Sequence, residues 1–382
     1  MIYLDSGATT LEKPPEVARA MARAVGTMSS PGRGNYPASR RAEQTAFACR
    51  EEAARLFQVP TPDQVVFTSN ATHGLNIAIR SLVRPGGRVA ISGYEHNAVT
   101  RVLHSIPGVE MIVADAPLFA PEKILEGFHR ALRRGVDAVV CNHVSNVFGC
   151  VQPVEAIAQL CRRYNTPLIV DASQSAGILP VTLSDWGAAF VAMPGHKGLY
   201  GPQGMGLLLC GGEASPLLFG GTGSASKIQT MPSDLPDRLE AGTHNMPGIA
   251  GLLEGLRFVA RMGTENIADH EIRLTRRAAR GLAALPGVEV FADRKGQSQT
   301  GVLSFRVRGM DSEQIGEELA RRQIAVRSGL HCAPLAHRTA GTLETGTVRL
   351  SPSIFNTPRH IDTFLRELTA ILRENESSGS RS

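Results

Sequence analysis

Side chains that could act together in catalysis stand on separate segments of this chain. Lys197 closes a glycine-containing turn after an apolar run, and Asp171 ends another apolar run. Cys332 lies in a glycine-containing loop, with Arg327 before it and Arg349 after it. An amine, a carboxylate, a thiol and two guanidinium groups are what an enzyme needs to act on a sulfur-containing amino acid with pyridoxal phosphate. Any one of these residues alone would carry little meaning.

The surroundings of Lys197 favour a reactive amine over an ordinary loop lysine. A solvated lysine has a pKa of ~10.4 and is a poor nucleophile, so a lysine that forms an imine needs a pocket that favours its neutral form. Lys197 stands between an apolar strand and the glycine-rich segment 198–204, which is consistent with such a pocket. Asp171 supports this interpretation, because a carboxylate facing a pyridine nitrogen keeps it protonated. Gln174 could bond the phenolic oxygen of the ring, and His96 could stack on its face.

Two polar loops could bind a phosphate group. Residues 68–73 follow an expected strand and open an expected helix, where backbone N–H groups and hydroxyl side chains make a phosphate cradle. Taken alone, this segment is more typical of an ordinary Ser/Thr helix cap. The loop that contains Thr243 could add a hydroxyl contact, although by itself it is only a turn.

Cys332 indicates which reaction the cofactor would support, because a thiol can act on a sulfur-containing substrate. His331 and Arg327 flank it, and positive neighbours lower the pKa of a thiol from ~8.5. The alternative is a loop cysteine without a role. Arg327 or Arg349 could hold a substrate carboxylate by a two-pronged hydrogen bond, and the apolar neighbours of Arg349 favour a buried partner.

Composition restricts the class of protein. The 382 residues exceed the ~250–300 at which a single core stops growing, which predicts two domains. A hydrophobic content of 42% with 20% charged residues is typical of a soluble globular protein. The net charge is +5 without a dense basic block, so nucleic acid is not an expected partner. No apolar run approaches the ~20 residues of a membrane helix, and we expect neither membrane association nor a secretory signal.

The six cysteines are scattered without paired spacing. This pattern predicts neither a metal site nor a disulfide framework, and it favours a reducing cytoplasm.

The order of the expected elements indicates an α/β fold. Short apolar runs rich in β-branched residues alternate with helix-like stretches; the strands are expected at 65–68, 88–91, 138–141 and 167–170, and the helices at 39–57, 74–82 and 154–164. Apolar strands with helical crossovers predict a mostly parallel sheet covered on both faces. Ligands of such sheets bind beyond the carboxyl ends of the strands, where Asp171 and Lys197 fall.

After Asn245 the pattern changes to that of a smaller α+β unit. We expect helices at 248–262, 273–285, 312–322 and 359–373, and a strand at 301–307. These segments predict a large domain at 16–248, a small domain made of 1–15 and 249–374, and a disordered tail at 375–382.

Taken together, these segments resemble the cysteine desulfurases of the class V aminotransferase group, nearest the SufS-like branch with a short active-site loop. The likeness runs from Tyr3 to Thr357. It is carried by Phe67-Thr68-x-x-Ala71-Thr72, Glu95-His96-Asn97, Asn146-x-x-Gly149, Asp171-Ala172-x-Gln174, Gly195-His196-Lys197, Glu240-Ala241-Gly242-Thr243 and Arg327-Ser328-Gly329-x-His331-Cys332. The resemblance implies the pyridoxal-phosphate transferase fold of type I, with a mostly parallel seven-stranded sheet flanked by helices and a smaller α+β C-terminal domain.

The resemblance also implies roles around pyridoxal 5′-phosphate. Lys197 would carry the covalent link, Asp171 would pair with the ring nitrogen, Gln174 would bond the ring oxygen, and His96 would stack on the ring. The residues expected at the phosphate are Ala71, Thr72 and His196, with Thr243 reaching the phosphate held by the other subunit of a homodimer.

On the substrate side, Asn146 and Arg349, together with Arg327, would hold the carboxylate of L-cysteine, and Cys332 would take its sulfur. Two departures from the family pattern matter most. Pro194 stands where a hydroxyl residue usually precedes Gly-His-Lys, and Leu330 replaces a histidine found in several desulfurases. The first removes a phosphate contact, and the second alters how protons are handled near the thiol.

The expected reaction converts L-cysteine to L-alanine and leaves a persulfide on Cys332. A selenocysteine lyase, a cysteine-sulfinate lyase or an amine-transferring relative remain alternatives within enzymes. A non-catalytic sulfur carrier is the alternative from another class, and the intact Lys197, Asp171 and Gln174 argue against it. A sulfur-acceptor protein is a possible partner, and the destination of the sulfur (iron–sulfur clusters, thio-modified nucleosides or a cofactor) is left open.

Overall fold

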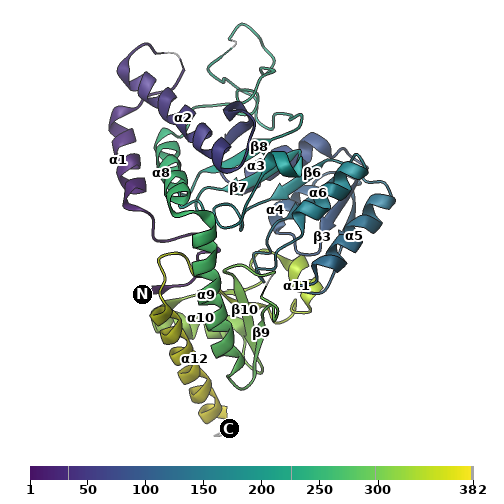
Figure 1. Cartoon of the computed structure of the whole chain (residues 1–382), viewed down its shortest axis with the longest axis vertical. Helices are drawn as coiled ribbons and strands as arrows, with labels where there is room; N and C mark the ends of the chain where they lie inside the picture. Colours follow the sequence, from purple (N-terminus) through teal and green to yellow (C-terminus); the bar gives the residue numbers. More distant parts are fainter. Residues whose placement is uncertain (33, 225, 297, 380–382) are drawn as a thin grey trace.

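A seven-stranded sheet forms the centre of the larger part of the molecule, a computed structural model that describes residues 1–32, 34–224, 226–296 and 298–379 (Figure 1). The strand order is β2-β8-β7-β6-β5-β3-β4. Strands β4, β3, β5, β6 and β7 are parallel to one another, and β8 is antiparallel to both β7 and β2. The strands are β2 (Val65–Thr68), β3 (Arg88–Ser92), β4 (Glu110–Ala114), β5 (Ala138–Asn142), β6 (Leu168–Asp171), β7 (Phe190–Pro194) and β8 (Gly206–Cys210). The predicted mostly parallel sheet of seven strands is confirmed.

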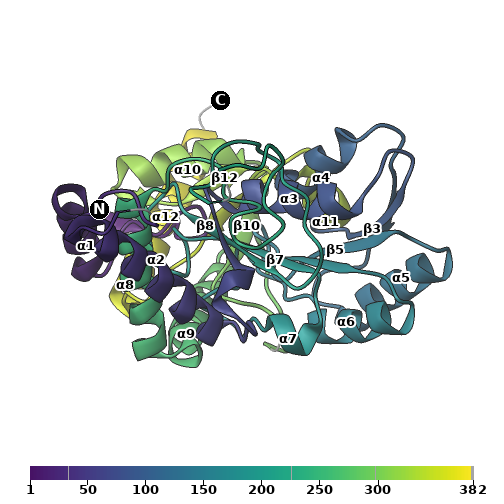
Figure 2. The same ribbon diagram turned by 90° about the horizontal axis from the view of Figure 1, so that it is seen from above.

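Helices cover both faces of this sheet, which explains why its central strands are apolar up to their carboxyl ends. Every residue of β5, β6, β7 and β8 is buried. Figure 2 shows α3 (Ala71–Leu82) and α4 (Asn97–His104) on one side of the strands. On the other side lie α5 (Pro121–Arg133), α6 (Val154–Arg163) and α7 (Leu183–Trp186). A strand buried on both faces cannot alternate polar and apolar residues.

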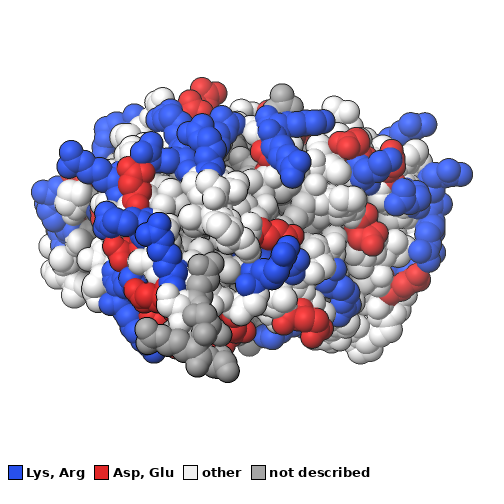
Figure 3. All heavy atoms as spheres, turned by 90° about the horizontal axis from the view of Figure 1, so that it is seen from below, with Lys and Arg blue, Asp and Glu red and all other residues white. Residues whose placement is uncertain are grey.

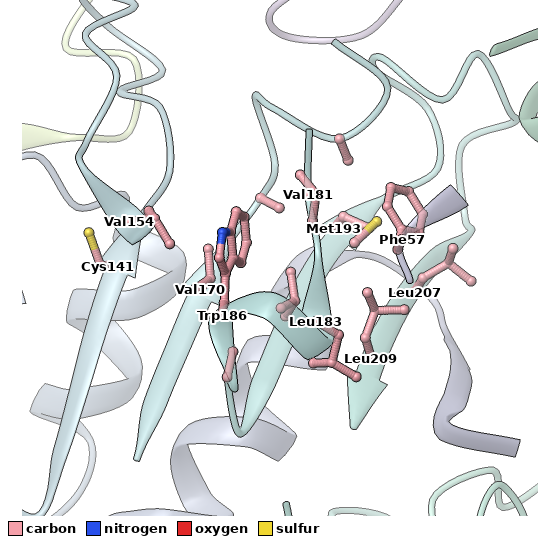
Figure 4. Close-up of a cluster of buried hydrophobic side chains, with 14 of the residues drawn as sticks. Phe57, Cys141, Val154, Val170, Val181, Leu183, Trp186, Met193, Leu207 and Leu209 are labelled. Atoms are coloured by element: carbon pink, nitrogen blue, oxygen red, sulfur yellow. The ribbon is translucent and has the colours of Figure 1, made fainter. Parts of the chain in front are cut away.

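Part of the core lies between α7 and the sheet (Figure 4). Trp186 and Leu183 project from α7 toward Val170, Met193 and Leu207 of three neighbouring strands. Burying an aliphatic or aromatic side chain of this size stabilises the fold by about 1.5–3 kcal/mol. This packing fixes the strands whose ends carry Asp171 and the turn before Lys197.

A smaller antiparallel sheet forms the second packing unit. Its order is β12-β13-β10-β9, with β9 at Val288–Phe291, β10 at Leu303–Val307, β12 at Arg327–Gly329 and β13 at Thr347–Leu350. Helices α9 (Thr264–Ala283), α10 (Ser312–Arg321) and α12 (Pro358–Gly379) contribute apolar side chains to its core, and α11 (Pro334–Ala340) follows the Cys332 loop. The N-terminal strand β1 (Ile2–Tyr3) pairs with β11 (Ile324–Ala325), so the first residues join this unit.

Helix α8 (Met246–Met262) links the two units but packs mainly with the larger one. It lies beside α1 (Pro15–Thr27) and α2 (Pro37–Leu56), and Figure 1 shows the three together. Its Ile249 and Leu252 belong to the core of the seven-stranded sheet. The expected boundary between 248 and 249 therefore falls inside a helix, and we propose that the larger unit extends to Gly263, where the backbone has a positive φ of 79°.

Two helix ends differ from the expected positions. Helix α9 begins at Thr264 instead of 273, because the buried Glu271 interrupts the apolar pattern of its inner face. Helix α12 continues to Gly379, beyond the expected end at 373, and it includes the first five residues of the expected tail. Residues 380–382 of that tail lie outside the described residues.

Within the described ranges, no helix combines the length and the apolar character needed to span a membrane. On the face drawn in Figure 3, Lys and Arg side chains are interspersed with Asp and Glu side chains.

Candidate active site

A cavity of about 210 Å³ lies beyond the carboxyl ends of β5, β6 and β7. Parallel strands bring their carboxyl ends to one edge, so residues far apart in the sequence meet there. The residues expected to act on a cofactor or substrate that line this cavity are Ala71, Thr72, His96, Asn146, Asp171, Gln174, His196 and Lys197. A hollow of about 690 Å³ beside β9 and β10 is lined by none of them.

Lys197 is held by a tight turn after β7. Its carbonyl oxygen accepts a hydrogen bond from the Tyr200 N–H at 3.0 Å, and the Gly201 N–H donates back to the Gly195 carbonyl oxygen at 2.8 Å. Burial lowers the pKa of Lys197 to about 8, and the positive charge of Arg349 acts in the same direction, while Asp171 opposes it. The amine therefore gives up its proton more readily than an ordinary lysine, as a nucleophilic amine requires.

Asp171 and Gln174 project from the end of β6 and the turn that follows. Asp171 is 5% exposed, and its Oδ1 accepts hydrogen bonds from the Ser173 N–H at 2.9 Å and from the Ser173 hydroxyl. Gln174 Nε2 donates to the Gly7 carbonyl oxygen at 2.9 Å. The N-terminal segment thus forms part of the wall around Lys197, a contact that the sequence alone did not indicate.

His96 is the N-cap of α4 and is neutral at neutral pH. Its Nδ1 accepts a hydrogen bond from the Ala98 N–H at 3.0 Å, so the ring proton resides on Nε2. Burial lowers the pKa of His96 to about 4, although Asp171 opposes this shift. A neutral ring can lie against an aromatic cofactor without adding charge.

The N-terminus of α3 opens on the same cavity. Asn70 caps the helix by accepting the His73 N–H at 2.9 Å, and the N–H groups of Ala71 and Thr72 precede any acceptor that the helix itself offers. The close approach of Asn70 to β8 requires glycine at position 206, since a Cβ there would lie 2.8 Å from the Asn70 carbonyl carbon. Such a helix start suits a phosphate group.

Pro194 and His196 sit beside this helix start. Pro194 lines the cavity and has no hydroxyl group to offer, in line with the departure seen in the sequence. Burial lowers the pKa of His196 to about 4, and its buried Nδ1 has no hydrogen-bond partner in the part of the chain that the structure describes. A ligand at this point would complete the bonding of that nitrogen.

Two hydrogen bonds, one from a backbone N–H and one from the Asn146 side chain, tie the Cys332 loop to the cavity wall. The Cys332 carbonyl oxygen accepts the Asn97 N–H at 2.8 Å, and Asn146 Nδ2 donates to the His331 carbonyl oxygen at 2.8 Å. Both His331 and Cys332 have positive φ angles, 48° and 56°. Cys332 is exposed, whereas the other five cysteines are buried.

His331 does not supply the positive charge that the sequence suggested. It is 5% exposed, and its Nε2 lies 3.1 Å from the Thr347 carbonyl oxygen. Burial lowers the pKa of His331 to about 2, and the charge of Arg349 lowers it further. The expectation of a protonated histidine beside Cys332 is therefore wrong, because its side chain points into the core. Arg327, at the start of β12 just before this loop, is an exposed cationic residue.

Arg349 is already paired in this structure. Its side chain is 2% exposed, its Nη2 donates to Asp5 Oδ1 at 2.7 Å, and its Nη1 donates to the Asn146 carbonyl oxygen at 2.8 Å. Arg327 lies directly opposite on the neighbouring strand. Asp5 is the site residue that sequence reasoning missed. The signal for it in the sequence was its place two residues after Tyr3, where the likeness begins.

Thr243 lies apart from the Lys197 cavity. It is exposed and lines a separate cavity of about 260 Å³. The base of its loop is fixed by Glu240, which accepts two hydrogen bonds from Arg50 at 2.9 and 2.6 Å and one from the Phe67 N–H at 2.6 Å. The expected contact of Thr243 with a second subunit stays a prediction.

The architecture and this lysine-centred cavity define the class of protein. Residues 2–364 match the model of the aminotransferase class-V family. The chain belongs to this family.

The relatives and solved structures that resemble this chain include several cysteine desulfurases. A probable cysteine desulfurase of Methanothermobacter thermautotrophicus is 32% identical over 94% of this chain and 92% of its own length. A probable cysteine desulfurase of Mycolicibacterium paratuberculosis is also 32% identical over 99% of this chain, which spans only 56% of that longer relative. The apo structure of a cysteine desulfurase from Thermococcus onnurineus superposes with a TM-score of 0.88 at 28% identity, covering 98% of this chain and 95% of that one. The likeness supports the predicted type I fold.

Proposed function

We propose that this protein is a pyridoxal-phosphate-dependent cysteine desulfurase, which converts L-cysteine to L-alanine and transfers the sulfur to Cys332 as a persulfide. The observation that carries this proposal is one cavity that is lined by Lys197, Asp171 and His96 and whose wall is tied by two hydrogen bonds to the Cys332 loop. The names of its relatives and structural neighbours point the same way.

The residues around the cavity fit pyridoxal phosphate. Lys197 offers an amine whose pKa is lowered to about 8, and Asp171 offers a buried carboxylate for the ring nitrogen. The N-terminus of α3 and the unpaired Nδ1 of His196, which meets no acceptor or donor among the described residues, suit the phosphate end. When bound, this cofactor supplies the electron sink that weakens bonds at the α-carbon of an amino acid.

We assign proton transfer to Lys197. An amine with a pKa near 8 can both release and accept a proton at neutral pH, as a general acid–base group must. Lys197 removes the α-proton of the substrate and returns a proton later. Asp171 keeps the ring nitrogen protonated, Gln174 holds the ring oxygen, and His96 packs as a neutral ring.

Cys332 is assigned the sulfur transfer. Its thiolate attacks the substrate sulfur, so that an S–S bond forms while the C–S bond of the substrate breaks and the bonding pair stays on carbon. Protonation of that carbon gives L-alanine, and the persulfide remains on Cys332. Arg349 and Asn146 hold the α-carboxylate, with Arg327 at the rim.

The test is incubation with L-cysteine, with and without a reductant, on the wild type and on Cys332→Ala. With reductant, the wild type should release alanine and sulfide in equal amounts, and Cys332→Ala should release neither. Cys161→Ala is the matched control, because Cys161 is a buried cysteine on α6, and it should keep activity. Full activity of Cys332→Ala would disprove the persulfide route.

The same assay separates the alternatives. A keto acid as product would indicate transamination, and faster turnover of selenocysteine or cysteine sulfinate would identify one of the related lyases. A protein that stays colourless after incubation with pyridoxal phosphate would indicate a non-catalytic sulfur carrier.

We also propose a cytoplasmic homodimer that passes sulfur to an acceptor protein, with iron–sulfur cluster assembly among the possible destinations. The exposure of Thr243, on a loop anchored through Glu240, supports a contact with a second copy. Sedimentation of wild type and of Thr243→Ala, each with cofactor, tests it: the wild type should be a dimer, and the variant should lose cofactor more easily.

A further inference from the structure

The Arg349 guanidinium is held on two sides, and one of its three nitrogens meets no acceptor among the residues that the structure describes. Asp5 accepts from Nη2 at 2.7 Å, and the Asn146 carbonyl oxygen accepts from Nη1 at 2.8 Å. The remaining Nε–H is buried and meets no acceptor among the residues described. A buried donor without an acceptor costs free energy, so native proteins rarely leave one unless a ligand or water completes it. This free donor marks a place where a further acceptor belongs.

Asp5 compensates the buried positive charge of Arg349. Burial lowers the pKa of Arg349, and the positive charge of Arg327 on the opposite strand lowers it as well, while Asp5 raises it by charge and by hydrogen bonding. An arginine this deeply buried is stable only with a well-placed anion beside it. Asp5 therefore offsets the cost of burying the guanidinium charge and holds the group in place.

Asp5 is itself firmly held. Strand β1 pairs with β11, and Asp5 forms a bridge with Ser351, two residues after Arg349. On the far side of Asp5, the Ser6 N–H donates to the Ser351 carbonyl oxygen at 3.0 Å and the Gly7 N–H to Ser351 Oγ at 2.8 Å. Asp5 could move away from Arg349 on substrate binding only if the segment that carries it were loosely attached. Because this segment is hydrogen-bonded on both sides of Asp5, Asp5 stays paired with Arg349 when substrate binds.

The Asp5 segment is also continuous with the cavity wall. The Gly7 N–H donates to Ser351 Oγ, and the Gly7 carbonyl oxygen accepts the hydrogen bond from Gln174 Nε2. A Cβ at position 7 would lie 3.4 Å from Arg349 Cζ and 3.1 Å from Ser351 Oγ. The contact with Ser351 would be tight, so glycine lets the backbone pass close to Ser351 and beside the guanidinium. The next residue, Ala8, lines the cavity.

We propose that Asp5 is a positioning residue for the substrate α-carboxylate, acting through Arg349. The inference rests on the proposed function, in which Arg349 binds that carboxylate. Asp5 and Asn146 occupy two of the guanidinium nitrogens, so the remaining donor edge is presented in one orientation. The ligand class that completes it is an α-amino acid with a free carboxylate, and a simple amine would gain nothing from it.

The test compares two ligands that differ in the carboxylate alone. L-alanine and ethylamine are titrated into the cofactor-loaded enzyme, and binding is followed by the absorbance of the bound cofactor. Asp5→Asn keeps the shape of the side chain and one acceptor oxygen but removes its charge. The dissociation constant of L-alanine should rise about tenfold or more in this variant, because charge-assisted hydrogen bonds are the strong ones. The constant for ethylamine should not change.

Kinetics give a second readout of the same role. In Asp5→Asn, the KM for L-cysteine should rise about tenfold while kcat stays within about threefold, because carboxylate binding is lost but the reacting groups are untouched. The matched control is Asp362→Asn, which removes an exposed carboxylate that pairs with Arg277 at 2.6 Å, and it should change neither constant.

Each outcome bears on a separate claim. If wild type binds L-alanine no better than ethylamine, the proposed function itself fails. If wild type discriminates and Asp5→Asn discriminates equally, or binds L-alanine more tightly, the positioning role of Asp5 is wrong. Should Asp5→Asn fail to fold, Asp5→Glu keeps the charge but moves the carboxylate by one methylene, and it must weaken L-alanine binding without affecting ethylamine; unchanged L-alanine binding would overturn the inference.

Discussion

Replacing the buried Glu271 with glutamine should stabilise the protein, and more so as pH rises. Glu271 lies in the middle of α9 and is 4% exposed. Burial raises its pKa from 4.5 to about 8, with the Tyr200 hydroxyl acting in the opposite direction. The folded state therefore binds the Glu271 proton more tightly than the unfolded chain does. The stability that this proton confers is complete below about pH 4.5 and is lost progressively as pH rises toward 8.

The magnitude follows from the size of the shift. Each pKa unit corresponds to about 1.4 kcal/mol, so the full window from pH 4.5 to 8 is worth about 5 kcal/mol, and at pH 7 about 3 kcal/mol has been lost. Glutamine has nearly the same shape and hydrogen-bonding capacity as the protonated acid and does not titrate. Glu271→Gln should thus match the wild type near pH 5 and exceed it at higher pH.

Thermal unfolding monitored by circular dichroism at pH 5, 7 and 8.5 measures this difference. For a chain of this length, about 3 kcal/mol corresponds to a shift in Tm of about 4 °C. Glu265→Gln, which removes an exposed acid in the first turn of the same helix, is the control and should show no such trend. A Tm difference between Glu271→Gln and the wild type that stays constant from pH 5 to 8.5 would refute the reasoning.

Two further predictions concern the core and the lysine. Trp186→Ala should lower the free energy of unfolding by about 3–5 kcal/mol, because the side chain fills the space between α7 and the sheet, and urea unfolding at fixed pH measures it. Borohydride reduction of the cofactor-loaded protein, followed by peptide mass spectrometry, should place the cofactor mass on Lys197, and Lys197→Ala should carry none. An adduct on another lysine would contradict the assignment.

The sequence predicted the central sheet well because its signals are local. Residues 138–141 and 168–170 are apolar throughout, and such runs have few other interpretations once helices alternate with them. Asp171 and Lys197 could then be placed together, since both follow strands whose carboxyl ends share one edge. The two residues meet in one cavity because β6 and β7 are parallel neighbours in the sheet.

What the sequence could not predict depends on burial and on distant pairing. His331 resembles a charged neighbour of Cys332 in the sequence, but its ring is buried and neutral. Asp5 reaches Arg349 only because β1 pairs with β11, a contact between opposite ends of the chain. The start of α9 was missed because a carboxylate occupies a core position, which no periodicity of apolar residues can reveal.

The distribution of thiols has a practical consequence. One of the six cysteines is solvent-exposed and five are enclosed in the fold, with burial raising the pKa of Cys49, Cys150, Cys161 and Cys210 to about 12. Thiolates react and protonated thiols do not, so a maleimide fluorophore added under native conditions should attach at position 332 alone. The molecule thus carries a built-in attachment point for a single dye, and the appearance of additional labelled positions would report the opening of the core.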